Sequence, residues 1–254
     1  MRILLTNDDG IASPGIDLLA KALRKAGHRV FILAPDADRS GTSHSITFLS
    51  GPCKITQIEN DTWSCSGTPV DCVIFALLGG IPELCIVEEP HGSAGKAPDL
   101  ILSGINRGAN IGTDIIYSGT AAAARQGSLI GIPSAALSLV EGDNGWHWGP
   151  AVSFIVEKLA EIRDYWREGT FVNVNFPNTA TGPSALIPAF PSHRRYNDRI
   201  ETYVAPDGGL YCFARAGKIT NNPQVQGKVN GSDWDEVMKN NAAFSVVLSQ
   251  PAVV

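Results

Sequence analysis

Apolar runs and amphipathic segments alternate along the first two thirds of the chain. Short apolar runs predict buried β-strands over residues 2–6, 30–34, 99–103, 133–139 and 171–176. Apolar positions at helical spacing predict helices over residues 14–26, 69–78, 121–130 and 148–166, and a stretch rich in Gly and Pro predicts an exposed loop over 88–98. Strands that alternate with helices in this way predict an α/β fold with a mostly parallel sheet, because parallel neighbours need a crossover connection.

The pattern changes after Pro177, where turns rich in Gly and Pro separate shorter segments. Residues 200–205 and 210–214 predict the two strands of a hairpin, 232–239 a short helix and 243–248 a last strand. We therefore expect an α/β domain over residues 1–177 and an extension over residues 178–254. The extension should carry a hairpin suited to self-association and return its last strand to the core.

Composition places the chain among globular proteins, with 44% hydrophobic and 18% charged residues. A net charge of −5 and the absence of any Lys/Arg run argue against a nucleic acid polymer as partner. Five cysteines, an odd number without C-x-x-C spacing, predict neither a disulfide framework nor a zinc site. A strand that begins at residue 2 leaves no room for a signal peptide, and no apolar run reaches membrane-spanning length, so we expect a cytoplasmic protein with no membrane partner.

The first predicted strand ends abruptly at two adjacent carboxylates, Asp8 and Asp9. Ligands of open α/β sheets bind at the carboxyl ends of the strands, where loops from neighbouring strands meet. Adjacent carboxylates raise each other's pKa unless a cation lies between them, and Mg²⁺ or Mn²⁺ is the simplest such cation. The alternative is an ordinary Asp-Asp-Gly turn in which one aspartate caps the helix that begins near Pro14.

Two further polar stretches should reach the same edge of the sheet. Residues 35–47 contain several hydroxyls, which could make only turn hydrogen bonds, and His44, a candidate for catalysis or substrate contact. Residues 104–114 carry glycines that let the backbone approach a ligand, with Asn106 and Asn110 as neutral polar groups. We therefore expect both stretches to border one ligand site.

The sequence Ser118-Gly119-Thr120 opens an alanine-rich helix. Hydroxyls and free N–H groups at a helix start favour an anion, so this segment is a candidate phosphate cradle. The alternative is a helix cap on a well-packed helix. Because the glycine-rich loop follows a strand and precedes a helix, we favour the cradle.

Taken in order, five motifs resemble the survival protein E (SurE) family: MRILLTNDDGI, DADRSGTSHSIT, GTPVDCV, SGINRGANIGTDIIYSGTAAAA and VNVNFP. The resemblance runs from residue 1 to about residue 177. It implies a Rossmann-like three-layer sandwich whose hairpin-bearing C-terminal extension mediates homodimers or homotetramers. It also implies a 5'-nucleotidase, a metal-dependent phosphatase that acts on nucleoside 5'-monophosphates and, in some members, on 3'-nucleotides and short polyphosphate.

The resemblance assigns roles to residues of the candidate site. One divalent metal ion per subunit, Mg²⁺ or Mn²⁺, would be held by Asp8, Asp9, Ser40 and Asn106. The substrate would be contacted by Asn110, Ser118, Gly119 and Thr120, together with the candidate His44. The catalytic residues would be Asp8, Asp9 and Asn106, and we expect Asp8 to combine base character with its role as a ligand.

Two other functions fit the same residues. In a phosphoaspartate-type phosphatase Asp8 would itself be the nucleophile, but such enzymes usually place a lysine in the pocket, and no lysine ends a predicted strand here. In a nucleotide-binding regulatory module the site would bind its ligand without hydrolysis. A dinucleotide site is not expected, because residues 104–112 lack the G-x-G-x-x-G spacing.

Overall fold

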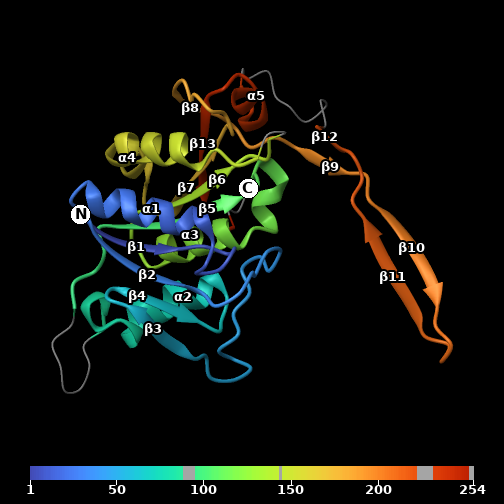
Figure 1. Cartoon of the computed structure of the whole chain (residues 1–254), viewed down its shortest axis with the longest axis horizontal. Helices are drawn as coiled ribbons and strands as arrows, with labels where there is room; N and C mark the ends of the chain where they lie inside the picture. Colours follow the sequence, from blue (N-terminus) through green and yellow to red (C-terminus); the bar gives the residue numbers. More distant parts are fainter. Residues whose placement is uncertain (88–94, 143–144, 222–230, 252–254) are drawn as a thin grey trace.

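A mixed β-sheet runs through the body of the molecule (Figure 1). The computed structural model describes residues 1–87, 95–142, 145–221 and 231–251, so most of the predicted loop at 88–98 lies outside the described residues. Within those residues, nine strands form the sheet in the order β3-β4-β2-β1-β5-β6-β7-β13-β8. Their bounds are β1 (Arg2–Thr6), β2 (Arg29–Pro35), β3 (Ile55–Glu59), β4 (Thr62–Cys65), β5 (Leu100–Arg107), β6 (Ser134–Leu139), β7 (Thr170–Phe176), β8 (Leu186–Pro188) and β13 (Ala242–Leu248).

Parallel pairing dominates the sheet. β1 pairs in parallel with β2 and β5, β6 pairs with β5 and β7, and β2 pairs with β4. Antiparallel pairing joins β3 to β4 at one edge and β13 to β7 near the other. The predicted α/β fold with a mostly parallel sheet is therefore confirmed.

Helices cover both faces of the sheet and complete three layers (Figure 1). The helices α1 (Pro14–Lys25) and α4 (Trp148–Tyr165) pack together on one face, and α2 (Pro69–Phe75) and α3 (Gly119–Leu129) pack together on the other. Shorter helical segments lie at Ala76–Gly80, Pro82–Leu84, Gly112–Ile116 and, as α5, at Asp233–Met238.

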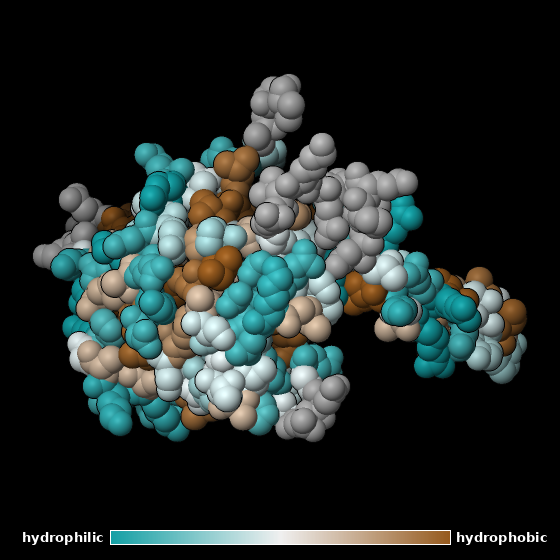
Figure 2. All heavy atoms as spheres, turned by 90° about the horizontal axis from the view of Figure 1, so that it is seen from above, coloured by the Kyte–Doolittle hydropathy of each residue, from teal (hydrophilic) through white to brown (hydrophobic). Residues whose placement is uncertain are grey.

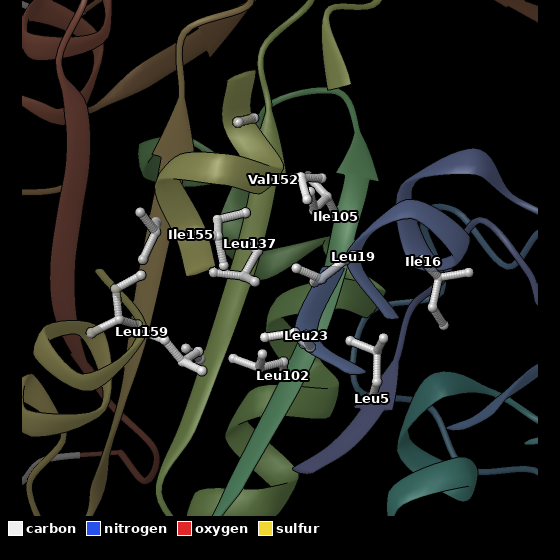
Figure 3. Packing of buried hydrophobic residues seen from close by; sticks show 14 of the residues in the cluster. Leu5, Ile16, Leu19, Leu23, Leu102, Ile105, Leu137, Val152, Ile155 and Leu159 are labelled. Atoms are coloured by element: carbon white, nitrogen blue, oxygen red, sulfur yellow. The ribbon is translucent and has the colours of Figure 1, made fainter. Parts of the chain in front are cut away.

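Alternate residues of the central strands enter two different cores, because successive side chains of a strand point to opposite faces. In β1, Ile3 and Leu5 pack in the core with α1 and α4, whereas Leu4 packs in the core with α2. Figure 3 shows Leu19 of α1 and Ile155 of α4 in the first of these cores. Burial of each side chain of this size contributes about 1.5–3 kcal/mol to folding stability, so β1 is held by packing on both faces. The carboxylates Asp8 and Asp9 therefore follow a well-anchored strand.

The glycine-rich stretch after the predicted strand 99–103 is partly strand. β5 extends to Arg107, and its residues Asn106 and Arg107 pair with Ser138 and Leu139 of β6. A register shift between Ser103 and Asn106 marks a bulge in this ladder. The predicted strand end at residue 103 is therefore wrong, because pairing with β6 keeps the backbone extended beyond the bulge.

The chain beyond Pro177 contributes both to the sheet and to a projecting arm. The strands β8 and β13 complete one edge of the sheet. The predicted hairpin is confirmed as β10 (Arg199–Val204) and β11 (Leu210–Arg215), and it is flanked by the pair of β9 (Arg194–Tyr196) and β12 (Ile219–Asn221). Figures 1 and 2 show the hairpin standing away from the body, and all its strand residues are exposed. The division into two domains at residue 177 stays a prediction.

The cysteines of the described chain form no disulfide. Cys65 and Cys72 are buried, whereas Cys212 is exposed on the hairpin. None of the described helices combines the length and the hydrophobicity needed to cross a lipid bilayer.

Candidate active site

The carboxyl ends of β1, β2 and β5 meet where the connections of the sheet change direction. The strand β1 has β2 on one side and β5 on the other, and such a switch point opens a crevice for ligands in α/β sheets. A cavity of about 650 Å³ lies here. Five of the predicted site residues line it: Asp8, Ser40, Asn106, Asn110 and Ser118.

Asp8 follows β1 with 3% of its surface exposed. Thr120 of α3 holds its carboxylate: the Thr120 N–H donates to Oδ2 at 3.1 Å, and the Thr120 hydroxyl donates to Oδ1. Gly119 permits this close approach, because a Cβ at that position would lie 2.9 Å from the Cβ of Asp8. Burial raises the pKa of Asp8, and the hydrogen bonds from Thr120 act against that rise.

Asp9 lies half-buried beside Asp8, and its Oδ2 accepts a hydrogen bond from the Arg107 N–H at 2.9 Å. Burial raises the pKa of Asp9 to about 6, and the charges of Asp8 and Asp38 add to this rise. The backbone hydrogen bond from Arg107 and, to a smaller extent, the charge of its guanidinium oppose it. Among the described residues, no Lys or Arg side chain forms an ion pair with Asp8 or Asp9. The Arg107 guanidinium lies instead over the Trp146 ring, 5.4 Å from its centroid. Within the described part of the chain, the two carboxylates therefore have no side chain paired with them as a counter-ion.

Two more oxygen donors of the predicted metal set line the cavity with Asp8. Asn106 donates from Nδ2 to the Gly108 carbonyl at 2.9 Å, which leaves its Oδ1 as an available acceptor. Ser40 is exposed in the cavity, and its N–H donates to Oδ1 of Asp38 at 2.7 Å. Carboxylate, amide and hydroxyl oxygens suit a hard dication such as Mg²⁺ or Mn²⁺. In the described parts of the chain no three His, Cys, Asp or Glu residues form a metal site, so a cation here would need the neutral oxygens as well.

Ser118 brings the N-terminus of α3 to the cavity. Its Oγ accepts a hydrogen bond from the Ala121 N–H at 2.9 Å, so Ser118 caps the helix and lines the cavity at the same time. The helix dipole favours an anion at this end. Gly119 and Thr120 lie next to Asp8 instead of in the cavity wall, so the contacts that the structure records for them act on the carboxylate.

Asn110 enters the cavity from the loop after β5, and polar side chains of β6 and β7 hold it. Its N–H donates to Oδ1 of Asn175 at 2.9 Å, and its Nδ2 donates to the Ser138 hydroxyl at 2.8 Å. Its carbonyl accepts from Nδ2 of Asn173 at 2.9 Å and of Asn175 at 3.1 Å. The alternation in the motif VNVNFP is thereby explained, because the valines enter the core and the asparagines support the loop.

His44 does not reach this cavity. Its Nε2 lies 3.0 Å from Oε1 of Gln126, and it lines a separate pocket with Arg125 and Leu129. Burial lowers the pKa of His44, so it is held in its neutral form more strongly than a free histidine. The geometry gives no support to the predicted substrate contact of His44.

Several residues of the cavity wall were not predicted from the sequence. Tyr117 directly precedes the predicted cradle Ser118-Gly119-Thr120, so its position in the sequence could have indicated that it lines the site. Tyr196 and Asp198 come from β9 and the residues after it, more than 70 positions further along the chain, and only the tertiary fold brings them here. Asp114 binds two groups of β9, because it accepts from the Tyr196 hydroxyl and from Nη1 of Arg194.

Three comparisons place the chain among known proteins. The family described as Survival protein SurE matches residues 3–196, a range that contains every site residue predicted from the sequence. The 5'-nucleotidase SurE of Geotalea uraniireducens (strain Rf4) is 36% identical over 248 residues, which cover 96% of this chain and 92% of that protein. The 5'-nucleotidase SurE of Xanthomonas campestris pv. campestris (strain B100) is 43% identical over 182 residues, 71% of this chain, and the chain covers 65% of the length of that relative.

A solved structure agrees with the sequence comparisons. The crystal structure of the SurE protein from Aquifex aeolicus superposes with a TM-score of 0.79 at 32% sequence identity. The match covers 99% of this chain and 95% of that one, so it includes the projecting arm as well as the sheet. The predicted resemblance is confirmed, and the chain belongs to the SurE family.

Proposed function

We propose that the chain is a divalent-metal-dependent phosphomonoesterase that hydrolyses nucleoside 5'-monophosphates to nucleoside and phosphate. The observation that carries this proposal is the carboxylate pair Asp8 and Asp9, which forms no ion pair with the described side chains. Asp8 lines the cavity together with neutral oxygen donors, and Asp9 lies next to it in the chain, outside the residues that line the cavity. The relatives named 5'-nucleotidase SurE support the class of substrate. The Geotalea relative supports it best, because its match extends over almost the whole of both chains.

The metal site of this proposal consists of Asp8, Asp9, Ser40 and Asn106, holding one Mg²⁺ or Mn²⁺ per subunit. When bound, such a cation lowers the pKa of a water ligand and screens the negative charge of a phosphoryl group. The two carboxylates supply the charge that retains a dication. Ser40 and Asn106 add oxygen without adding charge, so that an anionic substrate is not repelled from the loaded site.

The phosphoryl group of this proposal lies against the N-terminus of α3. In the described structure the Thr120 N–H is taken by Asp8 and the Ala121 N–H by Ser118, so the Gly119 N–H is the donor left for a phosphate oxygen. One N–H of the Asn110 amide is taken by Ser138, and its second N–H is the other donor that we assign to the phosphate. Together these groups would stabilise the charge on the transferring oxygens.

Asp8 is also the proposed acceptor of the proton that the attacking water loses. Asp8 lines the cavity and its carboxylate is held in one orientation by Thr120, which suits a group that must act on a positioned water. If Asp8→Asn retained most of the wild-type turnover at saturating metal, this base role would be wrong.

Self-association through the hairpin is the second part of the proposal, as a homodimer or homotetramer. Apolar side chains on the hairpin are exposed, and Figure 2 shows them as brown spheres on the projecting arm. They include Ile200, Val204, Leu210 and Phe213, whose exposed fractions run from 48% to 73%. An isolated two-stranded hairpin is only marginally stable in water, so a second copy that covers these side chains would stabilise it.

A substrate panel tests the function. Phosphate release is measured from 5'-nucleotides, 3'-nucleotides, short polyphosphate and glycerol phosphate, each with Mg²⁺, Mn²⁺ or EDTA. We expect metal-dependent release from 5'-nucleotides, and loss of that release in Asp9→Asn. Tight nucleotide binding without release would favour a regulatory module, and a covalent phosphoaspartate after rapid quench would favour the aspartyl-phosphate mechanism.

A further inference from the structure

Two tyrosines of the cavity wall form a corner that the proposed metal and phosphate sites do not use. Tyr117 and Tyr196 both line the cavity, and 57% and 38% of their surfaces are exposed. Their ring centroids lie 6.2 Å apart and their planes meet at 84°. A flat ring stacked on one tyrosine would therefore lie perpendicular to the other and present its edge to the face of that second ring, which is a favourable arrangement for aromatic groups.

Hydrogen bonds hold the Tyr196 side chain and the Tyr117 backbone before any ligand binds. The Tyr196 hydroxyl donates to Oδ1 of Asp114, and Arg194 donates to the other oxygen of the same carboxylate. The backbone around Tyr117 is held at both ends, because its N–H donates to the Asp114 carbonyl at 3.0 Å and its carbonyl accepts from the Ser43 N–H at 3.0 Å. Since the Tyr196 ring is oriented through its hydroxyl and the Tyr117 ring packs against it, a ligand would lose little free energy in ordering them.

The corner and the phosphate end belong to one continuous site. Tyr117 is the residue before Ser118, which caps α3, and both line the same cavity of about 650 Å³. A ligand that occupies both places must carry an anionic group near Ser118 and a flat aromatic group that reaches the two tyrosines. A nucleoside monophosphate has this shape, whereas glycerol phosphate and ribose 5-phosphate have the anionic end alone.

We infer that Tyr117 and Tyr196 form the nucleobase subsite, in which the base stacks in the corner while the phosphate lies at the N-terminus of α3. The inference rests on the proposed function. Stacking on an aromatic ring tolerates any base, because every base has a π-face. The corner therefore selects nucleotides over phosphomonoesters without a base and discriminates weakly among bases.

The test compares two substrates that share ribose and phosphate. The ratio of kcat/KM for adenosine 5'-monophosphate to kcat/KM for ribose 5-phosphate is measured for the wild type, Tyr117→Leu and Tyr196→Leu. We expect each leucine variant to lower this ratio by about tenfold, with the change mainly in KM for the nucleotide, because stacking is lost while the phosphate end remains. An unchanged ratio in both variants would overturn the inference.

Two control variants separate stacking from other effects. Tyr196→Phe keeps the ring and loses the hydrogen bond to Asp114, so it should restore the ratio that Tyr196→Leu loses. Phe48→Leu makes the same kind of change at a ring that is 37% exposed but outside the cavity, and its ratio should equal that of the wild type. A loss in Tyr196→Phe equal to that in Tyr196→Leu would assign the effect to positioning by Asp114 and contradict stacking.

Calorimetric titration distinguishes failure of the inference from failure of the proposed function. Adenosine and ribose are titrated into the wild type and both leucine variants, since adenosine occupies the corner without needing any chemistry. Binding of adenosine that is weakened in the variants supports the subsite even if the wild type releases no phosphate. Equal binding of adenosine in all three proteins overturns the subsite even if the wild type is an active nucleotidase.

Discussion

Thr120 holds the carboxylate of Asp8 with two donors at once, its backbone N–H at 3.1 Å from Oδ2 and its hydroxyl on Oδ1. The two residues are 112 positions apart in the sequence. This contact ties the start of α3 to the end of β1. It orients Asp8 and compensates part of the cost of burying a carboxylate.

Removing the Thr120 hydroxyl should weaken metal binding and turnover together. Thr120→Val keeps the shape of the side chain but loses one hydrogen bond to Asp8, and a bond to a charged group contributes about 1.5–3 kcal/mol. We therefore expect Mn²⁺ affinity, measured by calorimetry, to fall by about tenfold or more. Thr120→Ser retains the hydroxyl and should lie near the wild type. Equal Mn²⁺ affinity in the wild type and Thr120→Val would show that the hydroxyl does not position Asp8 for a metal.

The stability of the metal-free protein should fall as the pH rises toward 6. Asp9 has a pKa of about 6 in the folded protein against an ordinary 3.8, so between these pH values the folded state binds the proton more tightly. The stabilising effect of that proton is complete below about pH 4 and is lost above pH 6. Thermal unfolding of the wild type and Asp9→Asn in EDTA measures this effect as the difference between the two Tm curves.

The raised pKa of Asp9 fixes which of the two proteins has the higher Tm in EDTA. Asp9→Asn should be the more stable protein above pH 6, and the two curves should converge near pH 4. Saturating Mn²⁺ should reverse the order above pH 6, because the wild type alone keeps both carboxylates for the cation. Parallel curves in EDTA would mean that burial does not raise the pKa of Asp9.

A methyl group at position 119 should damage the site. The Cβ of Gly119→Ala would lie 2.9 Å from the Cβ of Asp8 and 3.0 Å from its Oδ2, so Asp8 would have to move. We expect kcat/KM for a nucleotide to fall by about a hundredfold, because a displacement of this kind disturbs a positioned catalytic group. The helical Gly149, where a Cβ meets nothing within 4 Å, provides the matched control, and Gly149→Ala should leave phosphate release as it is. Near wild-type activity in Gly119→Ala would mean that the position of Asp8 is not critical.

Removal of the hairpin should change the assembly and spare the fold of the body. Arg199 lies opposite Arg215 where the hairpin begins, so a two-glycine turn between Asp198 and Ala216 can close the chain after deletion of residues 199–215. Since the deleted strands are exposed throughout, we expect circular dichroism to remain that of an α/β protein. Light scattering should report a smaller assembly than for the full chain. An unchanged mass would place the self-association surface elsewhere.

Local patterns were sufficient for the central strands of the sheet and the helices that cover it, but the edge strands β3, β4 and β8 were not predicted. The apolar runs and the 3.6-residue periodicity predicted β1, β2, β6, β7 and the four helices of the outer layers, because burial on a defined face leaves its trace in the sequence. The end of β5 was predicted wrongly, because the extension through Arg107 depends on pairing with β6, a strand that is distant along the chain. The hairpin was predicted correctly from turn residues and short apolar segments.

The candidate metal ligands Asp8, Asp9 and Asn106 could be predicted from the sequence. They lie near the carboxyl ends of strands that the apolar runs had already located. The contact of Thr120 with Asp8 and the place of Tyr196 in the cavity wall could not be predicted from the sequence. A threonine at a helix start and a tyrosine in a short strand occur in many proteins without any function at a site. Their partners, Asp8 and Asp114, lie 112 and 82 positions away. His44 shows the reverse case, a chemically suggestive residue that the fold directs to Gln126 instead.

By itself, the sequence determined the central strands, the covering helices and the polar residues near their ends, because periodicity, caps and turn residues act over a few positions. Only the tertiary structure decided which of those residues meet, how deeply Asp8 and Asp9 are buried, and that Tyr196 of β9 lines the cavity. Contacts between distant segments and the desolvation of a carboxylate depend on the packing of the whole chain, and no local pattern encodes them.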